Sequence, residues 1–222
     1  MSIAEKLTTI AENMHRVYAA GQAAGGGASQ EEIEQLKAFR GLNDYYEGRT
    51  TVFYNPYITT IGPRRFYSEK VEGLTEVDIP NVTKIEYQGF YNCVSVTNIN
   101  MPNVKILGNG AIQACTGLTS LSLPNLEEAG ANALRQLTGI TALDLPNLKT
   151  ADMHVFRQNT NLKEIKLPSL ITTGTTCFQE CSSLENIIFP SISSMGGSPF
   201  HTCTSLQRLI ITNEETVCTL GS

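Results

Sequence analysis

The chain has 222 residues, of which 41% are hydrophobic and 17% are charged, and its formal net charge is −5. This composition suits a protein with a buried core, and no apolar run approaches the roughly 18 residues that a membrane span requires. The mild negative charge, without any block of lysine or arginine, argues against a nucleic-acid surface. The sequence therefore predicts neither membrane insertion nor nucleic-acid binding.

Residues 1–20 predict an amphipathic helix that ends at Gly21. Its apolar stripe has heptad spacing and consists of Ile3, Leu7, Ile10, Met14 and Val17. One interpretation is a helix that docks on another part of the same chain, because an isolated helix of this length is marginally stable. The interpretation that we favour is self-association, so this helix predicts a homo-oligomer.

Two further segments precede the main domain. Residues 21–30, which include the sequence GQAAGGGAS, predict a flexible linker. Ser29 and Glu32 have the spacing of a capping box and predict the start of a second helix, within residues 31–48. The apolar side of that helix consists of Ile33, Leu36 and Phe39. We expect this helix to cap the exposed end of the domain that follows.

Residues 49–222 are dominated by a repeat with a period of 22 residues. The tetrapeptide Leu-Pro-Asn-Leu occurs at 123–126 and again at 145–148. One proline column holds this register over six units: Pro80, Pro102, Pro124, Pro146, Pro168 and Pro190. Apolar columns hold it as well, and they include Leu121, Leu123 and Phe178. Such a period predicts a repeat architecture.

Each unit predicts one short strand, because apolar residues alternate in L-x-x-L-x-L-P and the proline ends the backbone ladder. A single unit cannot bury its own apolar edge. We therefore expect a leucine-rich-repeat solenoid with one parallel β-sheet, about 22 residues per turn, and a length of about 35–40 Å for seven or eight turns. Leu121, Leu123 and Phe178 are expected in its core.

Two features of the repeat predict local backbone structure. Glycine recurs at Gly108, Gly130, Gly174 and Gly196, which predicts a corner with positive φ in each turn. The first turn is longer, because Pro56 and Pro80 are 24 residues apart, and an insertion between 68 and 73 explains the difference. Terminal repeats are commonly atypical.

The unit LTSLSLPNLEEAGANALRQLTG, with FQECSSL and FHTCTSL in later units, resembles the BspA-like (Treponema-type) leucine-rich repeat. The family pattern is L-x-x-I-x-L-P, then I-G, A-F and C-[TS]-x-L, and the resemblance covers about residues 50–212. It implies a solenoid used for binding and adhesion. Leu137 and Asn159 depart from the pattern at the family's cysteine position. The opening SIAEKLTTIAENMHRVYAAG and the block FYNPYITTIGP resemble leucine-rich-repeat proteins from phages and prophages of gut Firmicutes.

The cysteines predict packing rather than chemistry. Four of the six, Cys93, Cys115, Cys181 and Cys203, share one phase of the repeat, which predicts a column of buried free thiols. A zinc site built from Cys177, Cys181, His201 and Cys203 is the alternative, but C-x3-C with H-x-C is an uncommon zinc spacing. We therefore predict no metal and no cofactor.

No recognisable catalytic motif surrounds the three histidines, His15, His154 and His201. Asp152 and His154 are two residues apart in a return segment, and that position is more typical of a solvated corner than of an acid–base pair. The sequence therefore predicts a protein without catalytic residues, not an enzyme.

The outward strand positions are the candidate binding residues. The predicted face consists of Thr75, Asp78, Thr97, Asn100, Thr119, Ser122, Thr141, Asp144, Lys163, Lys166, Ile188 and Ile210. Small polar residues at its centre would admit an extended protein segment or a glycan, while an inert solvated face is the alternative. Ile188 and Ile210 predict an outward apolar patch. We expect residues 213–220 to fold back over the last turn, because a bare edge strand exposes backbone donors and acceptors.

Three functions fit these observations. The first, which we favour, is a phage or prophage virion component, either tail-associated or receptor-binding, that would reside in the bacterial cytoplasm before assembly. Its repeats would present the binding face to a protein or glycan on a cell surface. The second is a bacterial cell-surface adhesin of the BspA type. The opening MSIAEKLTTI does not read as a Sec signal peptide, so this adhesin would need another route to the surface. The third is an intracellular scaffold.

Overall fold

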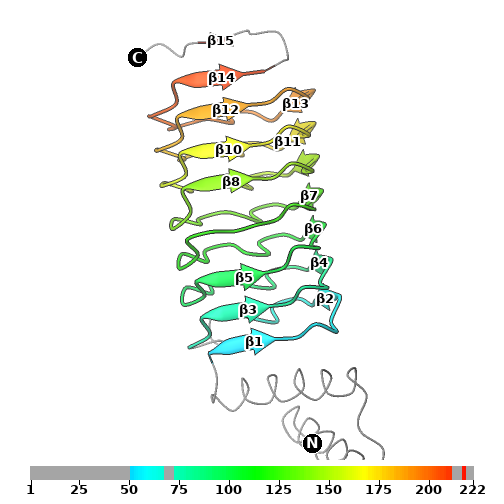
Figure 1. Ribbon diagram of the computed structural model, residues 1–222. Coiled ribbons are helices and arrows are strands. Elements are labelled where there is room, and N and C mark those ends of the chain that lie inside the picture. Colours follow the sequence, from blue (N-terminus) through cyan, green and yellow to red (C-terminus); the bar gives the residue numbers. More distant parts are fainter. Residues whose placement is uncertain (1–50, 68–72, 212–216, 219–222) are drawn as a thin grey trace, which may run out of the picture.

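The computed structural model describes residues 51–67, 73–211 and 217–218. Within them, the chain forms a column of stacked turns, and most turns contain two short strands (Figure 1). The predicted segments 1–20, 21–30 and 31–48 lie outside the described residues, as do the stripe from Ile3 to Val17 and most of the proposed insertion. Self-association through that stripe therefore stays a prediction.

The predicted strands form two parallel ladders, β1 to β5 and β8 to β14, which we together call the first sheet. Its strands are β1 (Val52–Tyr54), β3 (Glu76–Asp78), β5 (Asn98–Asn100), β8 (Ala142–Asp144), β10 (Glu164–Lys166), β12 (Asn186–Ile188) and β14 (Arg208–Ile210). Glu76 pairs with Asn98, one period of 22 residues later, whereas Val52 pairs with Glu76, which matches the longer first turn. The ladder is interrupted at 120–122, between β5 and β8.

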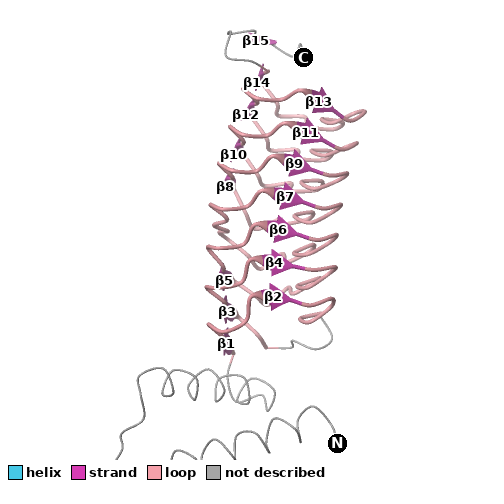
Figure 2. Cartoon of the chain, turned by 90° about the vertical axis from the view of Figure 1, so that its right-hand side faces the viewer, coloured by secondary structure: helices cyan, strands magenta, loops and turns pink. Residues whose placement is uncertain are grey.

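The structure adds a second parallel sheet that the sequence did not predict (Figure 2). Its strands are β2 (Thr60–Ile61), β4 (Lys84–Ile85), β6 (Ile106–Leu107), β7 (Glu128–Ala129), β9 (Thr150–Ala151), β11 (Thr172–Thr173) and β13 (Ser194–Met195). Each has two residues, so one side chain faces outward and the next faces inward, as in Lys84 and Ile85. Two residues are too few to give a recognisable alternation in the sequence.

The core lies inside the stacked turns, and it confirms the register read from the repeat. Leu123 and Phe178 are fully buried, and Leu121 is 8% exposed although no strand is assigned at its position. Aromatic rings stack from turn to turn on the far side of the core: Phe66 and Phe90 have centroids 4.7 Å apart with an interplanar angle of 2°. Stacked turns therefore supply the buried surface that one repeat lacks.

The recurring Leu-Pro-Asn-Leu has a structural explanation. Both leucines point into the core, and the proline lies just beyond the strand position. The Nδ2 group of Asn125 donates to the carbonyl oxygen of Pro102 on the preceding turn at 3.0 Å, and Asn147 does the same to Pro124 at 2.7 Å. In the next unit, Ser169 Oγ takes over this role. The tetrapeptide thus combines core packing, a strand stop and a cross-turn hydrogen bond.

The cysteine column is confirmed as a set of free thiols that pack in or against the core. The Sγ of Cys115 donates to the carbonyl oxygen of Phe90 at 2.8 Å, and that of Cys181 to Phe156 at 3.0 Å. Asn159, a departure from the family pattern, makes the equivalent bond from its Nδ2 to the carbonyl oxygen of Leu134 at 3.1 Å. Its Oδ1 accepts the backbone N–H of Leu137 at 2.7 Å. An amide thus replaces a thiol as the buried donor.

The prediction of positive φ at the glycine column is wrong. The left-handed residues lie two and six positions later and are mostly not glycine, for example Asn132 (φ 59°) and Gln136 (φ 60°). The glycines are needed instead because neighbouring turns approach closely: a Cβ added at Gly174 would lie 2.3 Å from the backbone nitrogen of Met153. Gly196 has the same constraint against Gly174.

The far end of the solenoid corrects one predicted site residue. Ile188 is 46% exposed, as expected, but Ile210, its partner in the parallel register, is only 9% exposed. Ile210 lies where β15 (Val217–Cys218) pairs antiparallel with β14, so it is not at a bare edge. The prediction that the chain folds back over the last turn is confirmed for β15, and the remaining residues of that segment lie outside the described part.

Candidate binding faces

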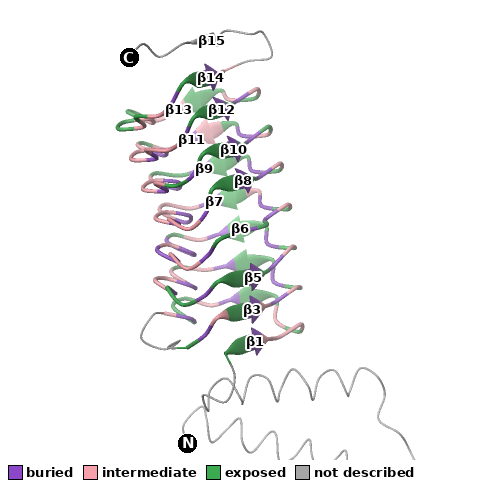
Figure 3. Cartoon of the chain, turned by 60° about the vertical axis from the view of Figure 1, so that its left-hand side comes forward, coloured by how far each residue is buried: buried purple, intermediate pink, exposed green. Residues whose placement is uncertain are grey.

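The predicted binding residues lie along the first sheet, where the structure has a hollow of about 900 Å³. One predicted column lines this hollow: Asp78, Asn100, Ser122, Asp144 and Lys166. These side chains come from β3, β5, the interrupted position, β8 and β10, and the outward strand positions are largely exposed (Figure 3). We call this surface the strand face. The sequence correctly predicted that these residues lie on one face, because outward residues of successive parallel strands point to the same side of a sheet.

The centre of the strand face is hollow because its side chains are small. Ser120, Ser122 and Ala142 are the outward residues there, and the strand ladder is interrupted at the two serines. Backbone N–H and C=O groups without a sheet partner must find another one. An extended chain laid into the hollow could therefore reach main-chain groups as well as side chains.

The charge of the strand face is negative. Its hollow is lined by four carboxylates, Glu76, Asp78, Asp144 and Glu164, and by the ammonium group of Lys166. Asn100 Nδ2 donates to Asp78 Oδ1 at 2.7 Å, and Lys166 Nζ lies 3.4 Å from Glu164 Oε1. A partner with basic side chains would complement this surface.

The second predicted column lies at the start of the strands and does not line this hollow: Thr75, Thr97, Thr119, Thr141 and Lys163. Thr97 Oγ1 donates to the carbonyl oxygen of Thr75 at 3.2 Å, and Thr75 Oγ1 donates to that of Thr51 at 3.2 Å. These two hydroxyls connect successive turns, so part of the predicted column is structural.

A second hollow, of about 730 Å³, lies farther along the same sheet. Its lining includes the exposed Ile188, the prolines Pro146, Pro168 and Pro190, and both Lys163 and Lys166. The apolar patch predicted at this end therefore consists of Ile188 and prolines, without the buried Ile210.

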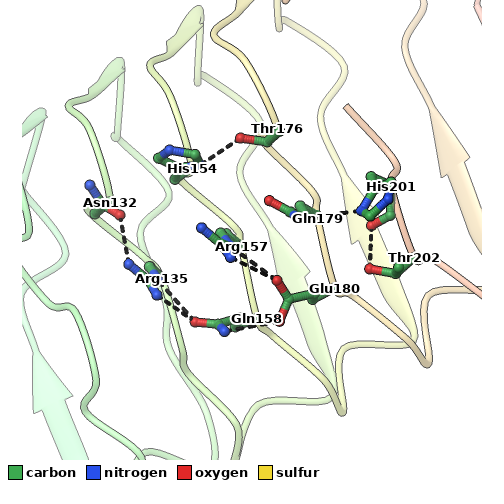
Figure 4. Close-up of polar contacts among 10 residues, drawn as sticks. All are labelled: Asn132, Arg135, His154, Arg157, Gln158, Thr176, Gln179, Glu180, His201 and Thr202. Carbon is green, nitrogen blue, oxygen red and sulfur yellow. Dashed lines mark hydrogen bonds and ion pairs between the residues drawn. The ribbon is translucent and has the colours of Figure 1, made fainter. Parts of the chain in front are cut away.

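A polar network that the sequence did not predict lies on the segment of each turn that follows the second sheet, which we call the loop face (Figure 4). Arg157 Nη2 lies 2.8 Å from Glu180 Oε1, and Gln158 Nε2 donates to Glu180 Oε2 at 2.9 Å. Arg135 donates to Gln158 Oε1 through Nε at 3.0 Å and Nη2 at 2.7 Å. These contacts connect three successive turns.

Left-handed backbone positions hold the loop face in shape. Gln158 (φ 65°) and Glu180 (φ 62°) occupy equivalent positions on adjacent turns. The Gln158 N–H donates to the carbonyl oxygen of Gln179 at 2.9 Å, which compensates for a conformation that non-glycine residues rarely adopt. In the sequence, Gln, Asn, Arg and Glu recur at the repeat positions of Arg157 and Gln158. These polar residues show no hydrophobic periodicity, so the pattern alone did not identify the network.

Aromatic side chains occupy the other end of the loop face. The rings of Tyr67 and Tyr91 stack with centroids 5.1 Å apart and an interplanar angle of 13°. The guanidinium carbon of Arg64 lies 5.3 Å from the ring centroid of Tyr87, a side chain that is 47% exposed.

The structure does not bring Asp152 and His154 together as an acid–base pair. Thr176 Oγ1 and His154 Nδ1 are 2.5 Å apart, and Asp152 Oδ1 accepts the backbone N–H of Met153 at 2.6 Å. Partial burial, and then the charges of Arg157 and Arg135, lower the pKa of His154, so this imidazole is neutral at pH 7.

The alternative zinc site is not assembled in the described residues, where no group of three or more His, Cys, Asp and Glu side chains could hold a metal ion. Cys181 and Cys203 donate instead to the carbonyl oxygens of Phe156 and Phe178. Among the same residues, no helix has the length and apolar character needed to cross a bilayer.

Comparisons with known proteins agree with this architecture. A family model described as the BspA-type leucine-rich repeat region, in 6 copies, matches residues 45–158 and 127–221. The crystal structure of a leucine-rich cell surface protein from Faecalibacterium prausnitzii A2-165 matches 68% of this chain with a TM-score of 0.62 and 26% identity. The match covers 42% of that chain, so this protein spans less than half of its length. A leucine-rich repeat protein from Treponema pallidum matches 63% of this chain and 67% of its own, with a TM-score of 0.57 and 23% identity. No curated protein matches the sequence.

Proposed function

The chain belongs to the BspA-type leucine-rich repeat family, and from this premise we propose that it is a cell-surface interaction module whose strand face binds an extended protein segment. Interaction modules are the general role of such repeats, and the F. prausnitzii protein of similar structure is a cell surface protein. Of the functions considered from the sequence, this proposal favours the cell-surface adhesin over the virion component.

The observation that carries the proposal is the hollow of about 900 Å³ on the strand face. It is lined by residues from six successive strand positions, and its side chains are smallest near Ser120 and Ser122. A long, shallow surface with small residues at its centre fits an extended chain better than a compact ligand. Its carboxylates would select a segment that carries lysine or arginine.

The binding role is supported by a surface that several successive turns build together, the strand-face hollow. That the protein is not an enzyme stays a prediction, and the family's description as a repeat region favours it. The virion role rested on residues 1–20, which lie outside the described part, and on the short resemblance of residues 53–63, so it stays a separate prediction. Light scattering would test the homo-oligomer: a chain beginning at Ser29 should form a smaller species than the full chain.

The strand face can be tested by filling its centre. Ser122→Arg places a long cationic side chain in the hollow, whereas Thr150→Arg places one on the exposed outward position of β9 in the second sheet. We expect labelled full-length protein to bind intact bacterial or epithelial cells, or an immobilised extracellular protein. Ser122→Arg should weaken that binding about tenfold or more, and Thr150→Arg should leave it unchanged.

Both variants must keep the melting temperature of the parent, because both positions are exposed. Equal binding by the parent and Ser122→Arg would show that the strand face is not the recognition surface. Equal loss in both variants would point to a general effect of the added charge.

A further inference from the structure

The loop face carries more hydrogen-bond donors than acceptors. Both carboxylate oxygens of Glu180 accept internal bonds, from Arg157 and from Gln158. Gln158 Oε1 accepts from Arg135, and Asn132 Oδ1 accepts from Arg135 Nη1 at 3.3 Å. A guanidinium has five N–H groups, so both arginines keep donors that these bonds do not use. The surface is therefore prepared for a ligand rich in acceptors.

The charge of this network points in the same direction. The network contains two guanidinium groups, Arg135 bonded to Gln158 and Arg157 bonded to Glu180, and one carboxylate, that of Glu180, in a protein whose formal net charge is −5. Both arginine side chains are half-buried and hydrogen-bonded to neighbouring residues. Ligand binding would therefore cost little additional side-chain conformational entropy. They occupy equivalent positions on adjacent turns, a separation close to the strand spacing of about 4.8 Å. Acidic groups repeated along the solenoid axis would meet one arginine after the other.

The aromatic end lies in the same phase of the repeat. Tyr91 precedes Arg135 and Arg157 in one column, two and three turns earlier, and Tyr67 stacks on it. An aromatic ring with a polar tip provides both an apolar surface and a hydrogen-bonding group. Sugar rings stack their C–H faces on such side chains, and planar amide and guanidinium groups bind their oxygens. The strand-face hollow also contains a tyrosine, Tyr54, but no arginine is among the residues that line it.

We propose that the loop face is a second recognition surface, and that it binds an acidic oligosaccharide that runs along the solenoid axis. Carboxylate groups of the ligand would lie on Arg135 and Arg157, and a sugar ring would lie beside Tyr91. The site is separate from the strand face, so the two faces can hold different partners at the same time.

Calorimetric titration with hexagalacturonate, a chain of carboxylated sugars, tests the proposal on the full-length protein. Maltohexaose, which has the same number of sugars without carboxylates, is the neutral control. Arg157→Gln should weaken hexagalacturonate binding about tenfold to a hundredfold, because it removes charge-assisted hydrogen bonds. Tyr91→Leu should weaken it about tenfold without changing a charge. Lys163→Gln removes the same charge from the strand face and should leave binding unchanged.

Three results would overturn the proposal: no binding of hexagalacturonate by the parent, equal affinity for maltohexaose, or an equal loss in Lys163→Gln. Melting temperatures of all variants establish that they are folded, and Tyr91→Leu tests the site independently of the Arg157–Glu180 contact. Ser122→Arg should bind hexagalacturonate normally. A failure of the strand-face function would therefore be seen separately from a failure of this site.

Discussion

The strand face and the loop face belong to the same turns but are built in different ways. On the strand face, a period of two separates inward Leu143 from outward Ala142 and Asp144, so core packing fixes which side chains face solvent. On the loop face, left-handed residues such as His154 and Gln158 set the geometry, and cross-turn hydrogen bonds stabilise it. One repeat thus holds a regular surface set by core packing and an irregular one set by left-handed residues and hydrogen bonds between turns.

The largest expected effect tests the register that both faces share. Leu123 is fully buried, so Leu123→Asp would place an unpaired carboxylate in the core and should destabilise the protein by several kcal/mol. Ser122→Asp, one residue earlier and exposed, should change the stability by less than about 1 kcal/mol. Urea unfolding measures both, and similar stabilities for the two variants would contradict the inside–outside assignment.

The next effect tests whether glycine is needed at Gly174 because neighbouring turns pack closely there. Gly174→Ala adds a Cβ 2.3 Å from the backbone nitrogen of Met153, so neighbouring turns must move apart, at a cost of about 3 kcal/mol. At Gly197 an added Cβ meets nothing within 4 Å, and Gly197→Ala should be nearly neutral. Thermal unfolding of the pair checks this, and a tolerated Gly174→Ala would mean that the turns are not packed as closely as described.

A smaller effect concerns the buried donor beneath the loop face. Asn159→Leu leaves the carbonyl oxygen of Leu134 and the N–H of Leu137 without their side-chain partner, which should cost about 2 kcal/mol. Asn159→Cys restores the kind of donor that Cys181 supplies in the next turn and should recover part of that loss. Equal free energies of unfolding for the leucine and cysteine variants, measured in urea, would show that a side-chain hydrogen-bond donor at position 159 does not stabilise the protein.

The smallest effect is a pH dependence specific to the loop face. Hydrogen bonds from Arg157 and then Gln158 lower the pKa of Glu180 below its ordinary value of 4.5. The stabilisation is therefore present above pH 4.5 and is lost as the pH falls through the lower pKa of the folded state. Since the contact is solvent-accessible, Glu180→Gln should cost less than about 1 kcal/mol at pH 7. The difference from the parent should shrink below pH 4.5, and a difference that is constant down to pH 3 would contradict it.

The sequence predicted what hydrophobic periodicity controls. The columns of Leu123 and Phe178, the thiols of Cys115 and Cys181, and the outward position of Ser122 all follow from a fixed period. The sequence did not predict the second sheet, because its strands have two residues each. It also did not predict the burial of Ile210, which lies beside the antiparallel strand β15. It also missed the network of Arg135, Gln158 and Glu180, because polar contacts between turns depend on left-handed backbone positions that have no periodic apolar signal.

The two faces of the same turns are proposed to recognise different ligands, and the arginine side chains report directly on binding at the loop face. In an NMR titration of the full-length protein with hexagalacturonate, the Nε–Hε signals of Arg135 and Arg157 should shift together and saturate at one ligand per chain. The signal of Arg208, an exposed outward residue of β14 on the first sheet, should not move. Shifts at Arg208 with none at Arg135 and Arg157 would contradict the account.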